Sequence, residues 1–204
     1  RHRKGPADAA VQVVMFTDYQ CPDCRRLEAQ MDRILQQRND VSLSIKHFPF
    51  CTDCNKYAGR TMHPNACWAA RASEAAAILG GEEGFWRMHR WLFDNKGQFT
   101  DASFPTSLRA LGFDPDRFKR VMTSANTADI IRPDMDDAKA LGIWFTPMIF
   151  INGVEYTWYL GSDASLAATI EKVAASTDRR VLVPPDAEGK LIADWRSQPM
   201  EAIP

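Results

Sequence analysis

The sequence has no cysteine after Cys67, so the last two thirds of its 204 residues contain none of its five cysteines. It also has no dense run of lysine and arginine, and its formal net charge is −1. Nucleic-acid binding needs concentrated positive charge, so we set that function aside. No stretch approaches the roughly 18 consecutive apolar residues that a membrane-spanning helix needs. We therefore expect neither a nucleic-acid partner nor a membrane span in this chain.

The composition of the chain is typical of a globular protein. Apolar residues make up 45% of the chain, which allows one good-sized domain, or one domain that carries an insertion. Residues 1–10 are basic and then small and polar, without a signal-peptide pattern, and we interpret them as a leader or linker. The chain fits a soluble mature fragment, or one that is tethered to a membrane in the full-length protein.

The chain is organised around two cysteines, Cys21 and Cys24, which stand between an apolar strand at residues 11–16 and an amphipathic helix. Pro22 suits the first helical turn, where it removes no hydrogen bond. A sulfur at a helix start lies near unpaired amides and the positive end of the helix dipole, and both favour the thiolate. We predict a redox-active dithiol, with Cys21 as the exposed attacking thiol and Cys24 as the more buried resolving thiol.

A second pair with the same spacing, Cys51 and Cys54, follows after 26 intervening residues. Two such pairs are also a zinc-ligand pattern. Zinc knuckles usually sit on tight turns with glycine nearby, whereas Cys24 runs directly into a helix of about four turns. We therefore favour redox chemistry over zinc at the first pair.

Residues 51–67, which contain the second pair, show no clear periodicity and allow several interpretations. Their spacing is compatible with a structural disulfide between two of Cys51, Cys54 and Cys67, or with unbridged thiols. Zinc bound by these three cysteines and His63 is a further alternative. Spacing does not define the pairing. Because the total number of cysteines is odd, one thiol is left over if two disulfides form.

Other segments predict a sheet and its last helix. Residues 41–48 alternate apolar and polar residues, so with the first strand and helix they predict a parallel β–α–β unit with a right-handed crossover. Residues 143–159 predict two strands, the first beginning at residue 143, joined at Asn152-Gly153, the strongest short signal for a hairpin. A final helix capped by Ser162 or Asp163 should follow.

Between the two groups of strands, residues 65–142 have a helical pattern throughout. Gly80-Gly81 predicts a helix stop, and Asp114-Pro115 predicts a helix start with an aspartate cap. Thr127 is a candidate cap for a later helix, which Pro133 should kink or split.

This order of elements resembles the thioredoxin fold of the DsbA-like thiol–disulfide oxidoreductases over roughly residues 11–176. The stretches that carry the resemblance are residues 16–24 with the CxxC pair, His63-Pro64-Asn65-Ala66, Phe85-Trp86-Arg87-Met88-His89 and Thr146-Pro147. The resemblance implies an α/β fold with a helical domain inserted between the βαβ half and the ββα half.

The resemblance also implies a division of the chain into parts. Residues 11–50 and 143–176 are expected to form the thioredoxin-fold domain. Residues 51–142 are expected to contain a loop and the inserted helices, and residues 177–204 a C-terminal extension.

The implied function is exchange of a Cys21–Cys24 disulfide with cysteine-containing protein substrates, with disulfide formation as the expected direction. By the same resemblance, Pro147 is a cis-proline that faces the active-site disulfide, and the backbone of Thr146 binds an extended substrate segment. No bound cofactor is needed, but a redox partner protein must reset the pair. A periplasmic or otherwise extracytoplasmic location follows.

The Pro22-Asp23 dipeptide departs from the strong oxidant of this family, which has proline and histidine between its cysteines. An ionised Asp23 repels a thiolate at Cys21, so we expect a weaker oxidant, unless Asp23 points into solvent and has little effect. Two alternatives to a disulfide-forming enzyme stay open: a reductase or isomerase on the same scaffold, and a non-catalytic zinc-binding or interaction domain.

Overall fold

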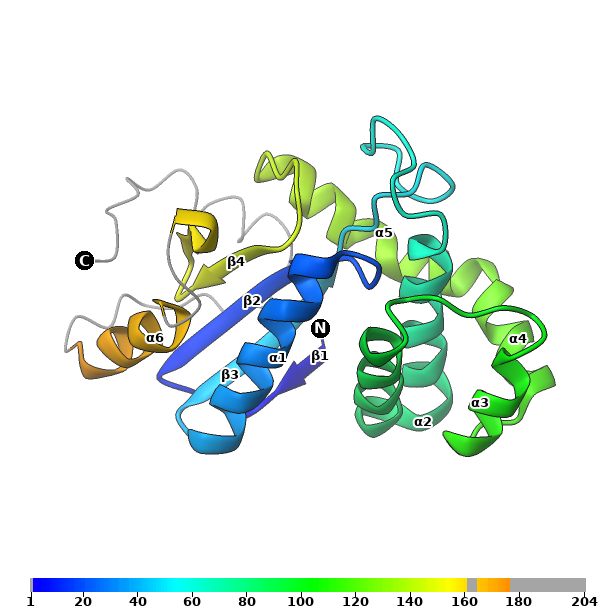
Figure 1. Cartoon of the computed structure of the whole chain (residues 1–204), viewed down its shortest axis with the longest axis horizontal. Coiled ribbons are helices and arrows are strands. Elements are labelled where there is room, and N and C mark those ends of the chain that lie inside the picture. Colours follow the sequence, from blue (N-terminus) through cyan, green and yellow to red (C-terminus); the bar gives the residue numbers. More distant parts are fainter. Residues whose placement is uncertain (1, 161–164, 177–204) are drawn as a thin grey trace. The chain divides into compact units, whose positions relative to one another are not determined.

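The structure is a computed structural model, and it describes residues 2–160 and 165–176 of the chain. A five-stranded sheet has the strand order β1-β3-β2-β4-β5 (Figure 1). The strands are β1 (His2–Lys4), β2 (Val11–Thr17), β3 (Val41–His47), β4 (Met148–Ile151) and β5 (Val154–Tyr156). Strands from the two ends of the chain therefore form one sheet, with β2 beside β4 at its centre.

Strand β1 corrects the prediction that residues 1–10 are only a linker. It pairs antiparallel with β3, with His2 opposite Ile45. A three-residue edge strand is too short to show a period, and its partner supplies its hydrogen bonds. All seven residues of β3 are buried. They include Lys46, whose Nζ donates to Asp137 Oδ2 at 2.7 Å, so the polar positions of this strand do not form an exposed face.

The predicted hairpin is confirmed. Strands β4 and β5 pair antiparallel, and Asn152 and Gly153 between them have φ angles of 51° and 81°. Two successive positive φ angles are typical of a two-residue hairpin turn. The strands are shorter than predicted: β4 begins only at Met148, because Pro147 has no amide hydrogen for the ladder. Residues after β5 form a short 3₁₀ helix, Trp158–Leu160.

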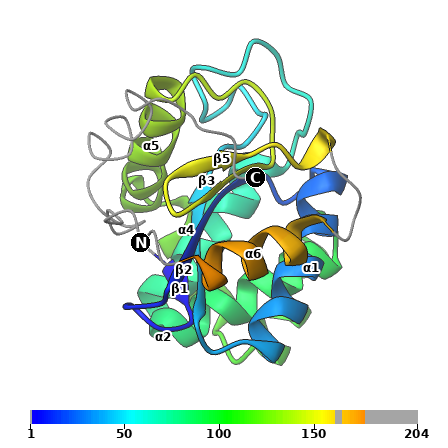
Figure 2. The same cartoon turned by 90° about the vertical axis from the view of Figure 1, so that its left-hand side faces the viewer.

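Two helices lie on the same side of the sheet, α1 (Pro22–Gln37) and α6 (Ser165–Ala175) (Figure 2). Helix α1 begins at its proline, as predicted, and α6 packs on β2. The expected cap of α6, at Ser162 or Asp163, lies outside the described residues, as do residues 177–204.

Four helices lie between β3 and β4 in the chain: α2 (Ala66–Asp94), α3 (Phe104–Ala110), α4 (Pro115–Thr123) and α5 (Ala125–Ala140). By their internal contacts the described residues form two compact units. The first unit contains the sheet. The second contains Asp18–Arg25 and His47–Met135, which include α2, α3 and α4. Within residues 2–160 and 165–176, none of the helices combines the length and apolar character needed to cross a membrane.

The inserted helices confirm two local predictions, contradict a third and decide part of a fourth. Helix α2 is interrupted at Gly81, whose φ of 63° and ψ of −159° are not helical. Asp114 caps α4, its Oδ1 accepting from Arg117 N at 2.7 Å. Thr127 is not a cap, because α5 begins two residues earlier. Of the two outcomes predicted for Pro133, the split does not occur, because α5 continues through the proline, with Ile131 fully buried. The kink stays a prediction.

The core of the second unit includes the two cysteines of the first pair. Cys21, Cys24 and Tyr19 belong to one apolar cluster with side chains of α2, α3 and α4. Its buried members from those helices are Ala69, Ala72, Ala75, Ala76, Met88, Leu92, Phe93, Phe104, Leu108, Phe118 and Met122. The sulfurs therefore belong to the packed interior of this unit.

Candidate active site

Cys21 and Cys24 lie at the start of α1. Cys21 directly precedes the first helical residue, and its carbonyl accepts a hydrogen bond from Arg25 N at 3.2 Å. It thus occupies the cap position, next to the unpaired amides of the helix N-terminus. Both cysteines are thiols in this structure. Cys21 is 7% exposed and Cys24 0%, so Cys21 is the more accessible of the two. It is nevertheless buried, which corrects the expectation of an exposed thiol.

The chain before the pair folds back over it. Cys21 N donates to the carbonyl of Asp18 at 3.1 Å, and Asp18 N donates to Cys24 Sγ at 3.5 Å. Pro22 and Asp23, the two residues between the cysteines, are both exposed. The sulfur of Cys24 is therefore held beneath a tight turn, while the dipeptide that separates the cysteines lies at the surface.

Asp18 is a buried carboxylate that gathers several donors. Its side chain is 0% exposed. One oxygen accepts from Gln20 N at 2.8 Å, and the other accepts from Phe50 N and from His63 Nδ1, each at 2.8 Å. A buried charge needs such compensation. Asp18 therefore joins the segment that leads into the CxxC pair to the loop between β3 and α2.

His63 lies against Asp18, with one fifth of its side chain exposed. The hydrogen bond to Asp18 raises the pKa of His63 against the opposing effect of burial, and the negative charges of Asp18 and Cys21 raise it further. The sequence pattern suggested His63 as a zinc ligand or a neighbour of a structural disulfide. The structure instead brings it together with the first cysteine pair. The role of Asp18 was missed, although an aspartate three residues before the first cysteine was a visible signal.

A second set of contacts, made by Asn65 at the end of the same loop, holds the segment before the cysteines. Asn65 N donates to Gln20 Oε1 at 2.7 Å, and Asn65 Nδ2 donates to the carbonyl of Gly97 at 2.7 Å. Gly97 has a φ of 61°, and a Cβ there would lie 2.9 Å from the carbonyl carbon of Tyr19. Real Cβ atoms essentially never approach that closely, so only glycine fits beside this stretch.

Two buried polar pairs lie in the same unit as the cysteines. The hydroxyl of Tyr19 is 2.9 Å from His89 Nδ1, and His47 Nε2 is 2.8 Å from Glu74 Oε1. Both histidines are nearly inaccessible. The rings of Tyr19 and His47 are 6.1 Å apart, so the two pairs are neighbours in the interior of the second unit.

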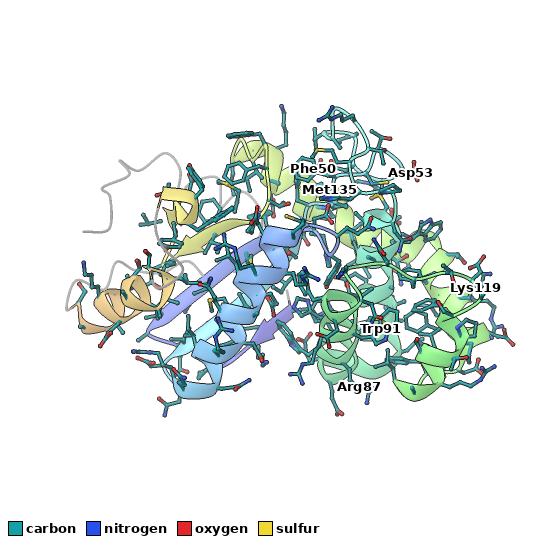
Figure 3. All side chains as sticks on the ribbon, in the orientation of Figure 1. Phe50, Asp53, Arg87, Trp91, Lys119 and Met135 are labelled. Atoms are coloured by element: carbon teal, nitrogen blue, oxygen red, sulfur yellow. A yellow bond between two sulfur atoms is a disulfide. The ribbon has the colours of Figure 1, made fainter. Side chains whose placement is uncertain are left out.

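The second cysteine cluster is organised differently. Cys54 and Cys67, which are 13 positions apart in the sequence, form a disulfide that closes a loop. Cys51 is a fully buried thiol packed with them. Cys51 Sγ points to the carbonyl of Pro64 at 3.7 Å. Figure 3 labels Asp53, which belongs to this loop.

The zinc alternative finds no support in this geometry. Two of its four candidate ligands, Cys54 and Cys67, are bonded to each other, and His63 Nδ1 faces Asp18. Among the residues that the structure describes, no group of three or more histidine, cysteine, aspartate or glutamate side chains is arranged to hold a metal ion.

Thr146 and Pro147 belong to the first unit, directly before β4. The peptide bond between them is cis. Thr146 is 7% exposed, and the carbonyl of Pro147 accepts a hydrogen bond from Trp158 Nε1 at 2.7 Å. The structure thus brings Cys21, Cys24 and His63 together in one unit with the Cys51, Cys54 and Cys67 cluster, and places these two residues in the other.

Comparison with known proteins shows the family to which the chain belongs. Residues 12–171 match the family model of the DSBA-like thioredoxin domain. The chain is also 31% identical over 175 residues to a Na(+)/H(+) antiporter, NhaA 3, from Salinispora tropica. That alignment covers 86% of this chain but 25% of the relative. The chain therefore spans about a quarter of the length of this curated relative.

Solved structures have the same fold. The thiol-disulfide exchange protein alpha-DsbA2 from Wolbachia pipientis has a TM-score of 0.67 at 18% identity, covering 84% of this chain and 86% of that one. A periplasmic thioredoxin-like protein from Salmonella enterica serovar Typhimurium has a TM-score of 0.63 at 24% identity, with 85% and 90% covered. These likenesses confirm the α/β fold with helices α2 to α5 inserted between the two halves of the sheet.

Proposed function

The chain belongs to the family of DSBA-like thioredoxin domains, and from that premise we propose that it exchanges a Cys21–Cys24 disulfide with the cysteines of protein substrates. One observation carries the proposal. Cys21 caps the N-terminus of α1 and is the more accessible sulfur, while Cys24 is fully buried one turn later. This arrangement suits an attacking thiol and a resolving thiol, because the helix start favours the thiolate of Cys21.

In the oxidising direction, a substrate thiolate attacks Cys21 Sγ. The bond between Cys21 and Cys24 breaks, Cys24 leaves as a thiolate, and a mixed disulfide joins Cys21 to the substrate. A second substrate thiolate then attacks the substrate sulfur of this bond and releases Cys21. The substrate has lost two electrons and the pair has gained them. The reducing direction is the reverse, with Cys21 attacking and Cys24 resolving.

Disulfide formation is the direction that we propose, with less oxidising strength than the family's strongest members. Asp23 stands where those members have a histidine, and it is exposed rather than directed into the core. Its charge opposes a thiolate at Cys21, and solvent screens much of that effect. A reductase or isomerase on the same scaffold is the second candidate, and the same aspartate favours it.

Substrate binding is assigned to Thr146 and Pro147. Main-chain hydrogen bonds from the backbone of Thr146 to an extended peptide accept many sequences, because they do not depend on side chains. A broad range of cysteine-containing protein substrates follows. Replacing Thr146 by proline removes its amide donor and tests this assignment through the KM for a peptide substrate.

A partner and a location complete the proposal. A redox partner protein must reset the pair, because each turnover leaves it in the opposite redox state from the one in which it started. We place the reaction in the periplasm or another extracytoplasmic compartment, where disulfides persist. A periplasmic protein is among the structural neighbours, and a relative named as an antiporter contains a matching segment, which supports a membrane-linked location.

The reduction potential of the pair tests the proposal. Equilibration with glutathione buffers, followed by mass mapping of alkylated Cys21 and Cys24, gives the fraction that is oxidised. A potential near −120 mV indicates a strong oxidase, and one near −270 mV indicates a reductase, by comparison with about these values for known proteins. The Cys21→Ser variant is the control and should not cycle. A wild-type pair that never cycles would overturn the function.

A further inference from the structure

We propose that His63 is the cationic residue that stabilises the Cys21 thiolate, and that Asp18 is the positioning residue that holds His63 in place. This inference rests on the proposed function, because a stabilised Cys21 thiolate matters for thiol–disulfide exchange. It assigns a role to a histidine that comes 42 positions after Cys21 in the chain, whereas the exposed Pro22-Asp23 dipeptide offers no cation.

Geometry fixes the position of His63 relative to the pair. Asp18 Oδ2 accepts from both His63 Nδ1 and Phe50 N at 2.8 Å, so the loop is tied to Asp18 at two points. Asp18 in turn contacts the pair directly, through its carbonyl to Cys21 N and its amide to Cys24 Sγ. Phe50, labelled in Figure 3, also packs its ring edge-on to the imidazole, with 6.4 Å between centroids.

The charges around His63 favour its protonated form. Among the described residues, the buried carboxylate of Asp18 and the uncharged ring of Phe50 contact the imidazole. Cys21 acts on it through its negative charge. Both titratable neighbours are negative when ionised, and both raise the pKa of His63. Coupling between two charges is reciprocal, so a cation at His63 stabilises the thiolate of Cys21 as much as the thiolate stabilises the cation.

The redox state of the pair should therefore change the protonation of His63. When the reduced Cys21–Cys24 pair gives up two electrons, its two sulfurs form a disulfide and Cys21 loses its negative charge. His63 then loses one of the charges that retain its proton. Reduction reverses this: the sulfur of Cys21 becomes a thiolate beside the imidazolium, and Cys24 takes up a proton. The cation favours the dithiol state, so it strengthens the protein as an oxidant.

The Cys54–Cys67 disulfide helps to hold His63 in this position, because it joins the chain on either side of the histidine. Residue 63 lies within the loop that the disulfide closes, four residues before Cys67. The loop also receives the bond from Asn65 N to Gln20 Oε1. The second cysteine cluster thus supports the proposed site by limiting the movement of the segment that carries the histidine.

Two variants separate the charge of His63 from its hydrogen bond. His63→Asn retains a donor for Asp18 and removes the charge, whereas His63→Lys retains a positive charge. The measurement is the rate of Cys21 alkylation by iodoacetamide from pH 4 to 9, followed by peptide mass mapping. We expect His63→Asn to lower the rate at pH 6 by about tenfold, and His63→Lys to recover most of it. An unchanged rate in His63→Asn would overturn the inference.

A second measurement does not depend on those variants folding. The pKa of His63, followed by NMR of its imidazole, should be higher in the reduced wild type than in Cys21→Ser, which has no thiolate at this position. Equal values in the two proteins would overturn the inference. Neither measurement uses a substrate. A protein without exchange activity whose Cys21 still responds to His63 would refute the proposed function and leave this inference intact.

Discussion

The two CxxC segments of the chain have the same spacing and different chemistry. Cys21 and Cys24 stand on the first turn of α1, whereas Cys51 and Cys54 lie in a loop and turn. In the first segment the helix start brings both sulfurs to one side of a turn. In the second, Cys54 is bonded to Cys67 and Cys51 is a buried thiol. Equal spacing therefore does not give equal bonding: the backbone around each pair decides whether its two cysteines share one helix start or one of them bonds to a third cysteine.

Replacing one cysteine in each segment should have the largest effect and should separate the two segments. Cys21→Ser should abolish disulfide exchange with a thiol substrate, because the attacking sulfur is lost. Cys51→Ser changes a sulfur of the other segment and should leave the rate within about twofold. Both are measured by the oxidation rate of a fluorescent dithiol peptide. A loss of activity in Cys51→Ser comparable to that in Cys21→Ser would show that the second cluster takes part in the chemistry.

The second effect concerns stability. The Cys54→Ala/Cys67→Ala double variant removes a cross-link between residues that are 13 positions apart in the sequence. We expect a loss of about 3 kcal/mol in the free energy of unfolding. That corresponds to a fall in Tm of roughly 6–12 °C. Urea unfolding against Cys51→Ala as the control checks this. A loss below about 1 kcal/mol would mean that the disulfide does not stabilise the loop.

A third change tests how tightly the first segment is held. Gly97→Ala places a Cβ 2.8 Å from Gln20 Cγ and 2.9 Å from the Tyr19 carbonyl carbon, at a φ of 61°. We expect a cost of about 2 kcal/mol from the unfavourable φ and the displaced segment, together with slower alkylation of Cys21. Gly112→Ala is the matched control, since it has a φ of 80° and nothing within 4 Å of the added atom. Equal effects of the two substitutions would contradict the close packing.

The smallest effect is a pH dependence. Because the folded state raises the pKa of His63 above its ordinary value of 6.5, the folded protein binds this proton more tightly than the unfolded chain. The resulting stabilisation is fully present below about pH 6.5 and is lost as the pH rises through the raised pKa. Subtracting the unfolding free energy of His63→Asn from that of the wild type should give a difference that shrinks from pH 5 to 9. A constant difference would contradict the assignment.

Local features of the chain could be predicted from the sequence, since they depend on residues that are neighbours in it. The helix start at Pro22, the Asp114 cap and the Asn152-Gly153 turn all follow from the preferences of one or two residues. The order of these elements, together with the resemblance to the DsbA-like family, indicated the α/β fold with its helical insertion.

Features that join distant segments could not be predicted in this way. Asp18 and His63 are 45 residues apart, and only the folded chain brings a carboxylate and an imidazole within 2.8 Å. The pairing of Cys54 with Cys67, rather than with Cys51, likewise depends on the path of the loop. Strand β1 was missed because its partner, β3, determines its conformation.

The position of Cys21 and Cys24 inside an apolar core links the redox reaction to the folding equilibrium. Reduction and unfolding form a closed thermodynamic cycle. The difference in unfolding free energy between the dithiol and disulfide forms therefore equals the difference in reduction free energy between the folded and unfolded chain. About 1.4 kcal/mol corresponds to about 30 mV for this two-electron couple. Two denaturation curves, one for each redox form, thus measure how far folding shifts the reduction potential of the Cys21–Cys24 pair from its value in the unfolded chain.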